Sequence, residues 1–526
     1  MNIERGLICL FKLSFYKRPD ICIRSIIKRM KKNMQKTTMS ENLETYFQSF
    51  RRNTIGVNHQ FKSVYGIQNQ LYADWIASGR LYQPIEEVIC NKIGPVMANT
   101  HSFSSETGKA STYAYHEARA IIKQHVNAGT DDVLVTTGTG MTGALARLHR
   151  IMGLKAKQHL SGSLERPVVF ISHMEHHSNQ VPWQALDVDV VLIAPDEKLQ
   201  ISLENLETQL KKYADRKVKI GSFTACSNVT GAIAPYYQLA EMMHAYNGLC
   251  FVDFAASAPY EVIDMHPENK KQKLDAIFFS PHKFLGGPGT SGVLVYDKKL
   301  HQNIHPDTPG GGNVKWTNPW SDYGYHTDLE TREDGGTPGI LQVIRTALCL
   351  KLKELMDPKM MKLREKELLD LFYEGVAEFP EIEVLGNREQ DHIGCVSFNV
   401  RAMHYNLVVR LLNDRFGIQV RGGWSCASSL AHYLFKIDSE QSEKMIQDIE
   451  NQNLTDKPGW VRVSLHPIMT NAEVQSIIEA LREIIQYGKE WATDYQYNPK
   501  TNEFDSLRQD DTELKKGMKA MFLGLA

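Results

Sequence analysis

Lys283 is the residue of this sequence whose surroundings most clearly indicate chemistry. It lies between two apolar runs, 276–279 and 292–296, in a turn that is rich in glycine. A lysine in an exposed loop needs no such backbone, because water solvates its charge. Glycine lets the main chain turn sharply and approach a ligand closely. The stretch 275–297 therefore predicts an amine held in place to react as a nucleophile.

The elements that must position this lysine alternate along the chain. Short apolar runs that read as buried strands stand at 132–137, 167–172, 219–225, 249–253 and 275–280. Helix-like periodicity separates some of them, as at 141–154 and 236–247. This alternation predicts an α/β domain with a mostly parallel sheet and right-handed crossovers. Ligands of such sheets bind outside the carboxyl ends of the strands, so the residues after each run are the candidates for a site.

The first two runs are followed by groups that suit a phosphate and a flat ring. Gly138, Thr139 and Gly140 precede a predicted helix, and free N–H groups beside a hydroxyl favour phosphate binding. A histidine-rich stretch, 173–179, follows the second run. One imidazole there could stack on an aromatic cofactor. Zinc is the alternative for paired histidines, but no cysteine or carboxylate set stands at metal spacing.

The remaining runs add an amide, a carboxylate and more phosphate ligands. Asn228 follows the third run and Asp253 closes the fourth, where it could cap a helix or hold a proton on a heterocyclic nitrogen. Ser280 and His282 stand just before Lys283. Each residue alone could serve as a turn former or a connector. Together they indicate pyridoxal 5'-phosphate (PLP), whose aldehyde forms a Schiff base with a lysine.

Several stretches carry a resemblance to a known family. They are "LYADWIASGR", "ISHMEHHSNQVPWQ", "SNVTG", "VDFAAS", "SPHK", "GGTPG", "VRGGWSCA" and "VRVSL". Over about residues 68 to 488 the chain resembles the class V aminotransferase family of fold-type I PLP enzymes, closest to its cysteine desulfurase and selenocysteine lyase branch. The resemblance implies a large, mostly parallel, seven-stranded-type sheet domain and a smaller α+β C-terminal domain.

The resemblance also implies roles for the residues after the strands. Lys283 would form the Schiff base, and His176 would stack on the ring. Asp253 would pair with the pyridine nitrogen and Asn228 would face the ring hydroxyl. The phosphate would be held by a set of small and polar residues: Gly138, Thr139, Gly140, Ser280 and His282.

Substrate and subunit contacts come from the later motifs. Arg462 resembles the arginine that binds the α-carboxylate of an amino-acid substrate, a bidentate task suited to guanidinium. Arg421 and Asn179 would be second contacts. Thr337 is similar to the threonine that reaches the phosphate of the other subunit, which implies a homodimer with shared active sites.

Cys426 decides between subclasses of the family. It stands where desulfurases place a nucleophilic cysteine, although a small buried residue is the alternative. Cys226 reads as packing. Two positions depart from the family: Ala256 replaces a glutamine that touches the ring hydroxyl, and Met141 lies in an altered phosphate motif.

We therefore expect a cysteine desulfurase-like enzyme that converts L-cysteine to L-alanine and leaves a persulfide on Cys426, which a sulfur-acceptor protein could then discharge. The alternatives are an aminotransferase or β-lyase acting on another amino acid, and a non-catalytic PLP-binding partner protein. Product analysis would separate the three.

Composition excludes other classes of protein. The chain has 526 residues, a formal net charge of −1 and a pI near 7.0, which give no electrostatic case for nucleic-acid binding. No apolar run reaches the length of a membrane span. The eight cysteines are scattered, which favours free thiols over a disulfide or zinc framework and predicts a reducing, cytoplasmic location.

Four segments are predicted along the chain. They are a basic extension (1–45), a large PLP-binding domain (46–340), a small C-terminal domain (341–490) and a polar tail (491–526). The extension could be a transit peptide, an interfacial helix or a stretch upstream of the true start, because Met30, Met34 and Met39 follow.

Overall fold

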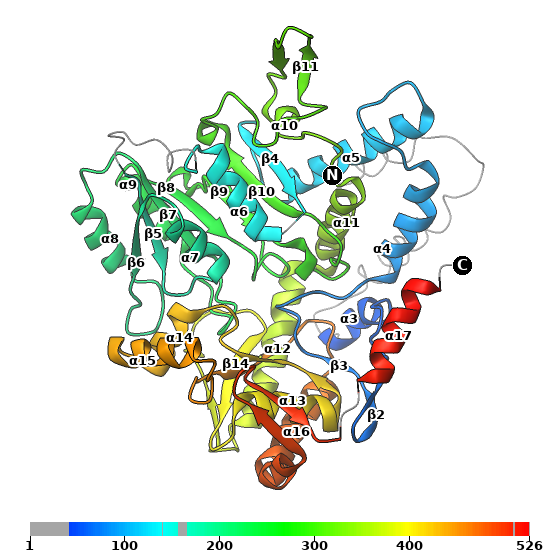
Figure 1. Ribbon diagram of the computed structural model, residues 1–526, viewed down its shortest axis with the longest axis vertical. Coiled ribbons are helices and arrows are strands. Elements are labelled where there is room, and N and C mark those ends of the chain that lie inside the picture. The colour runs from blue at the N-terminus through cyan, green and yellow to red at the C-terminus, as the bar shows by residue number, and fades with distance from the viewer. Residues whose placement is uncertain (1–41, 139, 156–165, 509–510, 525–526) are drawn as a thin grey trace.

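The computed structural model describes residues 42–138, 140–155, 166–508 and 511–524. A seven-stranded sheet forms its centre, with strand order β4-β10-β9-β8-β7-β5-β6 (Figure 1). The strands are β4 (Asp132–Thr137), β5 (Val168–Ser172), β6 (Asp189–Ile193), β7 (Lys219–Thr224), β8 (Leu249–Asp253), β9 (Ala276–Phe279) and β10 (Gly292–Asp297). Only β10 runs against its neighbours in this sheet. The predicted mostly parallel sheet is confirmed, and the carboxyl ends of all its other strands lie along one edge.

Alternating apolar side chains give this sheet two covered faces. In β4, Val133 and Val135 pack into one core cluster while Leu134 packs into the other. This is the period-two pattern of a strand that is buried on both sides. The helices that accompany the sheet are α5 (Glu106–His125), α6 (Gly140–Ile151), α7 (His177–Gln184), α8 (Leu203–Lys212), α9 (Tyr236–Ala245) and α11 (Ile340–Met356).

A smaller α+β unit follows the large sheet, as predicted. Its four-stranded antiparallel sheet has the order β13-β14-β17-β16. The strands are β13 (Ile382–Val384), β14 (Cys395–Val400), β16 (Arg421–Gly423) and β17 (Trp460–Ser464). The helices are α12 (Pro358–Val376), α13 (Tyr405–Phe416), α14 (Ser428–Phe435), α15 (Ser439–Glu450) and α16 (Asn471–Trp491).

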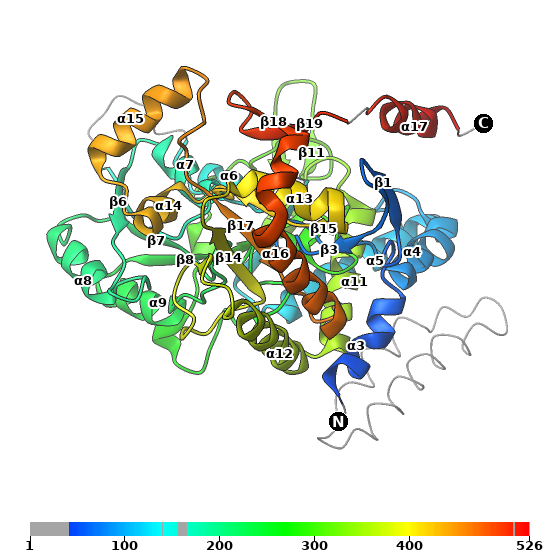
Figure 2. The ribbon, with the colours of Figure 1, turned by 90° about the horizontal axis from the view of Figure 1, so that it is seen from below.

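The segment before the large sheet crosses to this smaller unit. It contains α3 (Leu43–Arg52), the hairpin β1 (Gln60–Ser63) and β2 (Gly66–Asn69), β3 (Leu71–Tyr72) and α4 (Gln83–Val88). β3 pairs in parallel with β15 (Ile418–Gln419). Figure 2 shows β3 and β15 side by side next to α16. Residues near position 70 therefore lie against residues that come some 350 positions later.

The remaining elements form projections and the last segment. A hairpin of β11 (Val314–Thr317) and β12 (Tyr323–Tyr325) stands out beside α10 (Leu329–Arg332) in Figure 1. The predicted polar tail contains the hairpin of β18 (Tyr495–Asn498) and β19 (Glu503–Ser506), and the helix α17 (Thr512–Leu523). Tyr495 is buried, so part of this segment packs on the body.

The sequence also predicted a basic N-terminal extension and no membrane-spanning segment. Of the predicted basic extension, 1–45, residues 1–41 lie outside the described residues, and residues 43–45 begin α3. Within the described ranges, no helix combines the length and the apolar character needed to cross a bilayer.

Candidate active site

Lys283 lies directly beyond β9, in the short 3-10 turn Pro281–Lys283. The glycines around it allow close backbone contacts. A Cβ on Gly287 would overlap the carbonyl oxygen of Pro281, and a Cβ on Gly79 would overlap that of Phe284. The turn is therefore packed tightly on both sides, which holds the amine of Lys283 at the edge of the sheet.

Burial and neighbouring charges tune Lys283. Burial lowers the pKa of its amine from 10.5 to about 8, and the charge of Arg462 acts in the same direction while Asp253 opposes it. Asp253 is 3% exposed at the end of β8 and accepts a hydrogen bond of 2.8 Å from the backbone N–H of Ala255. Burial raises the pKa of Asp253 to about 6, against the effect of Lys283. Above pH 7 the site thus holds a carboxylate beside an amine that loses its proton readily.

His176 stands at the beginning of α7. Its Nδ1 accepts a hydrogen bond of 3.1 Å from the N–H of Ser178, which places the proton of the neutral ring on Nε2. Burial lowers the pKa of His176 to about 4, and the charge of Lys283 adds to this. The ring is therefore neutral at physiological pH, as is suitable for stacking on an aromatic ring.

The start of α6 meets the turn that carries Lys283. Ser280 Oγ accepts a hydrogen bond of 2.8 Å from the N–H of Met141, and a Cβ on Gly140 would lie 3.0 Å from the same oxygen. A Cβ on Gly138 would meet no atom within 4 Å, so its backbone faces open space. Burial lowers the pKa of His282 to about 4. Hydroxyl, imidazole and helix N-terminus together can cradle a phosphate. Thr139 lies outside the described residues.

Asn228 and Arg462 carry polar atoms without partners among the described residues. Asn228 donates a hydrogen bond of 2.8 Å to the carbonyl of Ser425, but its buried Oδ1 has no donor. Arg462, on β17, donates a hydrogen bond of 3.0 Å from Nη1 to the carbonyl of Asn228. Its buried Nε has no acceptor. Unpaired buried polar atoms are rare in folded proteins. Other buried side-chain atoms of the described residues also lack partners. These two differ in that Arg462 is bonded to Asn228, so a ligand bound at this point can supply both missing partners.

Asp74, for which no sequence motif predicted a role, joins this group. Its Oδ1 lies 2.9 Å from Arg462 Nη2, and its Oδ2 accepts 3.0 Å and 2.9 Å bonds from Nε and Nη2 of Arg421. Asp74 belongs to the stretch 71–80, which resembles the family. No sequence signal connects it with two arginines near the other end of the chain.

Asn179 is placed differently from its predicted role as a substrate contact. It is fully buried, and its Nδ2 donates a hydrogen bond of 2.6 Å to Glu175 while its Oδ1 accepts one of 2.7 Å from Ser222. Glu175 also accepts a hydrogen bond of 2.9 Å from the N–H of Thr224. Burial raises the pKa of Glu175 to about 7. The Asn179 side chain thus joins α7 to the sheet, and its amide nitrogen and oxygen are both hydrogen-bonded within the protein.

Cys426 lies in an exposed loop of the smaller unit, with φ of 58°. Its carbonyl accepts a hydrogen bond of 2.8 Å from the N–H of His177, and the preceding carbonyl is held by Asn228. The loop is therefore tied to residues that follow β5 and β7. Cys226, by contrast, is buried and its thiol contacts the carbonyl of Gly231 at 3.0 Å, in agreement with a packing role.

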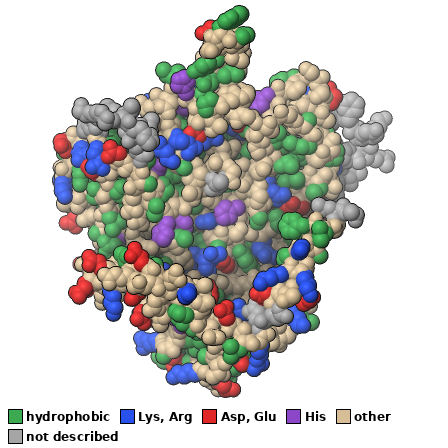
Figure 3. Space-filling model, in the orientation of Figure 1, with side chains coloured by type: hydrophobic (Ala, Val, Ile, Leu, Met, Phe, Trp, Pro, Cys, Tyr) green, Lys and Arg blue, Asp and Glu red, His purple; other side chains and the backbone are tan. Residues whose placement is uncertain are grey.

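The surface also shows basic and histidine side chains close together between the two sheets (Figure 3). In Figure 3, histidine and basic side chains gather near the middle of the face, between the large sheet above and the smaller unit below. Within the described part of the chain, no group of three or more His, Cys, Asp or Glu side chains is placed to hold a metal ion.

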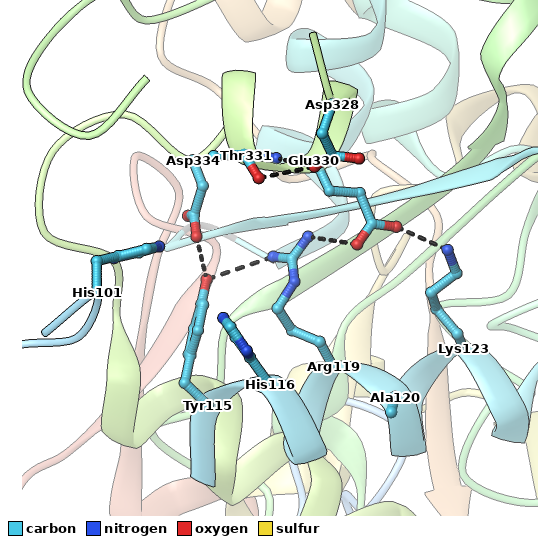
Figure 4. Close-up of a pocket in the computed structure, with 10 residues that line it drawn as sticks. All are labelled: His101, Tyr115, His116, Arg119, Ala120, Lys123, Asp328, Glu330, Thr331 and Asp334. Carbon is cyan, nitrogen blue, oxygen red and sulfur yellow. Dashed lines mark hydrogen bonds and ion pairs between the residues drawn. The ribbon is translucent and has the colours of Figure 1, made fainter. Parts of the chain in front are cut away.

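Thr337 is exposed. The loop that leads to it is anchored in a pocket between α5 and α10 (Figure 4). There Tyr115 donates a hydrogen bond of 2.8 Å to Asp334, and Glu330 pairs with Arg119 at 3.1 Å and with Lys123 at 2.7 Å. These charges hold the segment three residues before Thr337.

A sequence model of class V aminotransferases matches residues 71–477, which include both sheets and the residues described above. The chain belongs to the class V aminotransferase family. The predicted family membership is thereby confirmed. Class V aminotransferases are PLP-dependent enzymes, which also confirms the predicted enzyme class.

Relatives of this class V protein include two proteins named probable cysteine desulfurase. The one from Staphylococcus epidermidis is 28% identical over 376 residues, which cover 69% of this chain and 84% of the relative. The one from Pyrococcus abyssi is 28% identical over 425 residues, which cover 80% of this chain and 95% of the relative.

Solved structures of two cysteine desulfurases have folds similar to that of this chain. The apo structure of cysteine desulfurase from Thermococcus onnurineus NA1 has a TM-score of 0.68 at 24% identity and covers 83% of this chain and 98% of that chain. The cysteine desulfurase CsdA from Escherichia coli has a TM-score of 0.65 at 20% identity, and the match covers 84% of this chain and 98% of that chain. At these identities the likeness concerns the fold, and it agrees with the predicted fold-type I architecture.

Proposed function

We propose that this chain is a PLP-dependent, cysteine desulfurase-like enzyme that converts L-cysteine to L-alanine and transfers the sulfur to Cys426. One observation carries the proposal. Lys283 interacts electrostatically with both Asp253 and Arg462, and His176 interacts with Lys283 and Arg462, although these residues come from four separate segments. Perturbed pKa values of Lys283, Asp253 and His176 at the carboxyl edge of one mostly parallel sheet are typical of an active site.

The residues present fit PLP. The unpaired Oδ1 of Asn228 can accept a hydrogen bond from a ring hydroxyl, and the open space at Gly138 leaves room for a phosphate. The neutral ring of His176 can stack on a pyridine. When bound, PLP supplies an aldehyde for covalent attachment and a ring that accepts electrons from the substrate's α-carbon.

The chain's own residues divide the remaining work. Arg462 binds the substrate carboxylate, to which its unpaired Nε can donate. Lys283, whose pKa is about 8, removes the proton from the α-carbon, since a base with a pKa near the working pH transfers protons efficiently. Asp253 is ionised above about pH 6 and holds a proton on the heterocyclic nitrogen.

Cys426 accepts the sulfur. Its thiolate attacks the sulfur of the bound cysteine, so that a sulfur–sulfur bond forms at Cys426 and the carbon–sulfur bond of the substrate breaks. The carbon then takes up a proton and leaves as alanine. The guanidinium of Arg421 interacts electrostatically with Cys426.

Another amino-acid reaction on the same scaffold is the second candidate. It is favoured by Ala256 and Met141, which place apolar side chains where the resemblance implies a glutamine and a different phosphate motif. Both side chains are buried, at 5% and 3% exposed. An aminotransferase or β-lyase would need no thiol at position 426.

Product analysis tests the proposal. Purified protein loaded with PLP, given L-cysteine and a reductant, should release alanine and sulfide in equal amounts. Cys426→Ser should abolish both while leaving PLP content unchanged. Undiminished turnover of Cys426→Ser would favour the second candidate, and alanine formation by Lys283→Ala would contradict the role of the lysine.

The assembly and location belong to the same proposal. We infer a cytoplasmic homodimer in which the exposed Thr337 reaches the partner's phosphate site, and a separate protein that takes the sulfur from Cys426. Light scattering of the purified chain tests the dimer. Mixed dimers of Lys283→Ala and Thr337→Ala subunits test the sharing of sites, because the fraction of active centres would then depend on which subunits combine.

A further inference from the structure

Two arginines stand opposite each other in the smaller sheet. Arg421 on β16 is the direct cross-strand partner of Arg462 on β17. Like charges at such positions destabilise a sheet. Asp74 lies between them. Its Oδ1 accepts a hydrogen bond of 2.9 Å from Arg462, and its Oδ2 accepts two from Arg421, of 2.9 Å and 3.0 Å. One carboxylate therefore bridges two guanidiniums and leaves a net charge of one positive unit.

The backbone fixes Asp74 in this position. The N–H of Ala73 donates to the carbonyl of Gln419 at 2.9 Å, and the carbonyl of Ala73 accepts from the N–H of Ser464 at 2.7 Å. Ala73 is thus bonded to the strand before Arg421 on one side and to the strand of Arg462 on the other. The carboxylate of Asp74 is held between the two arginines by the elements that carry them.

The three side chains differ in their access to water. The Arg462 side chain is 3% exposed and that of Asp74 is 12% exposed, whereas the Arg421 side chain is 53% exposed. The buried end of the bridge is the one with an unpaired donor, Arg462 Nε. A single substrate carboxylate bound there would satisfy this donor and neutralise the remaining charge. A second acidic group would find Arg421 already occupied by Asp74.

We propose that Asp74 is a positioning residue that sets substrate charge specificity: it orients Arg462 for one carboxylate and occupies Arg421, so that amino acids with a second acidic group are disfavoured. This inference rests on the proposed function, in which Arg462 binds the substrate carboxylate. It goes beyond that function because it assigns discrimination between substrates to a residue that need not touch them.

Binding of two amino acids that lack a thiol, and so cannot be desulfurated, tests the inference. The dissociation constants of L-alanine and L-aspartate are measured by calorimetry on the PLP-loaded protein. Asp74→Asn keeps the size of the side chain but removes its charge and frees Arg421. We expect the preference for L-alanine over L-aspartate to fall by about tenfold or more, the size of one charge-assisted contact. With L-cysteine as substrate, KM should rise about tenfold while kcat changes less than about threefold.

Three further variants separate this role from a structural one. Asp74→Glu should restore part of the preference. The double variant Asp74→Asn/Arg421→Gln should lose the gained affinity for L-aspartate, and it also relieves the arginine repulsion should Asp74→Asn fold poorly. Asp494→Asn is the matched control, because Asp494 bridges Arg415 at 3.4 Å and Arg508 at 2.7 Å away from the site. It should leave both constants unchanged.

The outcomes for the two proposals are distinct. An unchanged ratio of the two dissociation constants in Asp74→Asn, or an equal loss with Asp494→Asn, would overturn the role of Asp74. Absence of alanine production from L-cysteine by the PLP-loaded wild-type protein would overturn the proposed function, whereas the binding ratio could still respond to Asp74.

Discussion

The pKa of Lys283 gives the most direct physical test of the site. Asp253 raises this pKa and Arg462 lowers it, while burial lowers it to about 8. Asp253→Asn should therefore move the titration of Lys283 to lower pH, and Arg462→Gln should move it to higher pH. The two substitutions remove opposite charges and form a matched pair.

The expected magnitude follows from the ionisation equilibrium. With a pKa of about 8, roughly one amine in four is unprotonated at pH 7.5, whereas an ordinary lysine with a pKa of 10.5 has about one in a thousand. Lys283 should therefore capture PLP on the order of a hundredfold faster than an exposed lysine at this pH. Asp253 is mostly ionised over the test range because its own pKa is about 6.

The assay is the rate at which protein stripped of PLP takes up added PLP, followed by absorbance between pH 6.5 and 10.5. The rate should rise with pH and level off above about pH 9, because the neutral amine is the reacting form. Lys283→Ala provides the baseline. A wild-type midpoint near pH 10, or shifts of the two charge variants in the same direction, would refute the reasoning.

Three other predictions concern the thiol, the phosphate cradle and the carboxylate contact. Cys426→Ser should retain PLP and lose alanine production from cysteine by more than about a hundredfold, measured by amino-acid analysis. Gly292→Ala should lower the free energy of unfolding by about 1–3 kcal/mol, because the new Cβ overlaps the backbone of Gly140, whereas Gly138→Ala should leave stability unchanged and weaken PLP binding. Denaturant titration with and without PLP distinguishes these two. Arg462→Lys should raise KM for cysteine about tenfold or more, because lysine cannot replace the bidentate fork, and steady-state kinetics would detect an unchanged KM as a contradiction.

The sequence predicted what depends on local pattern. The five apolar runs became β4, β5, β7, β8 and β9, and the residues after them lie at one sheet edge. This succeeded because strands buried on both faces are continuously apolar, and because the carboxyl ends of parallel strands share an edge. The position of Lys283 followed from these two rules.

What depends on distant pairing could not be predicted. Asp74 lies between Arg421 and Arg462, which are more than 340 residues away along the chain, and no periodicity connects these positions. Asn179 belongs to a stretch that resembles the family, yet within α7 its side chain is bonded to Glu175 and Ser222. A side chain's direction after a turn is set by packing, which local pattern does not report.

The pairing of β3 with β15 has a consequence for how the protein is made. Residues 71 and 72 emerge from the ribosome long before residues 418 and 419, their partners, have been synthesised. Until then this early strand has unpaired edges, the condition in which nascent chains aggregate or recruit chaperones. The carboxylate of residue 74 can meet its arginines only after residue 462 has left the exit tunnel, so catalytic competence should arise in one late step of biosynthesis.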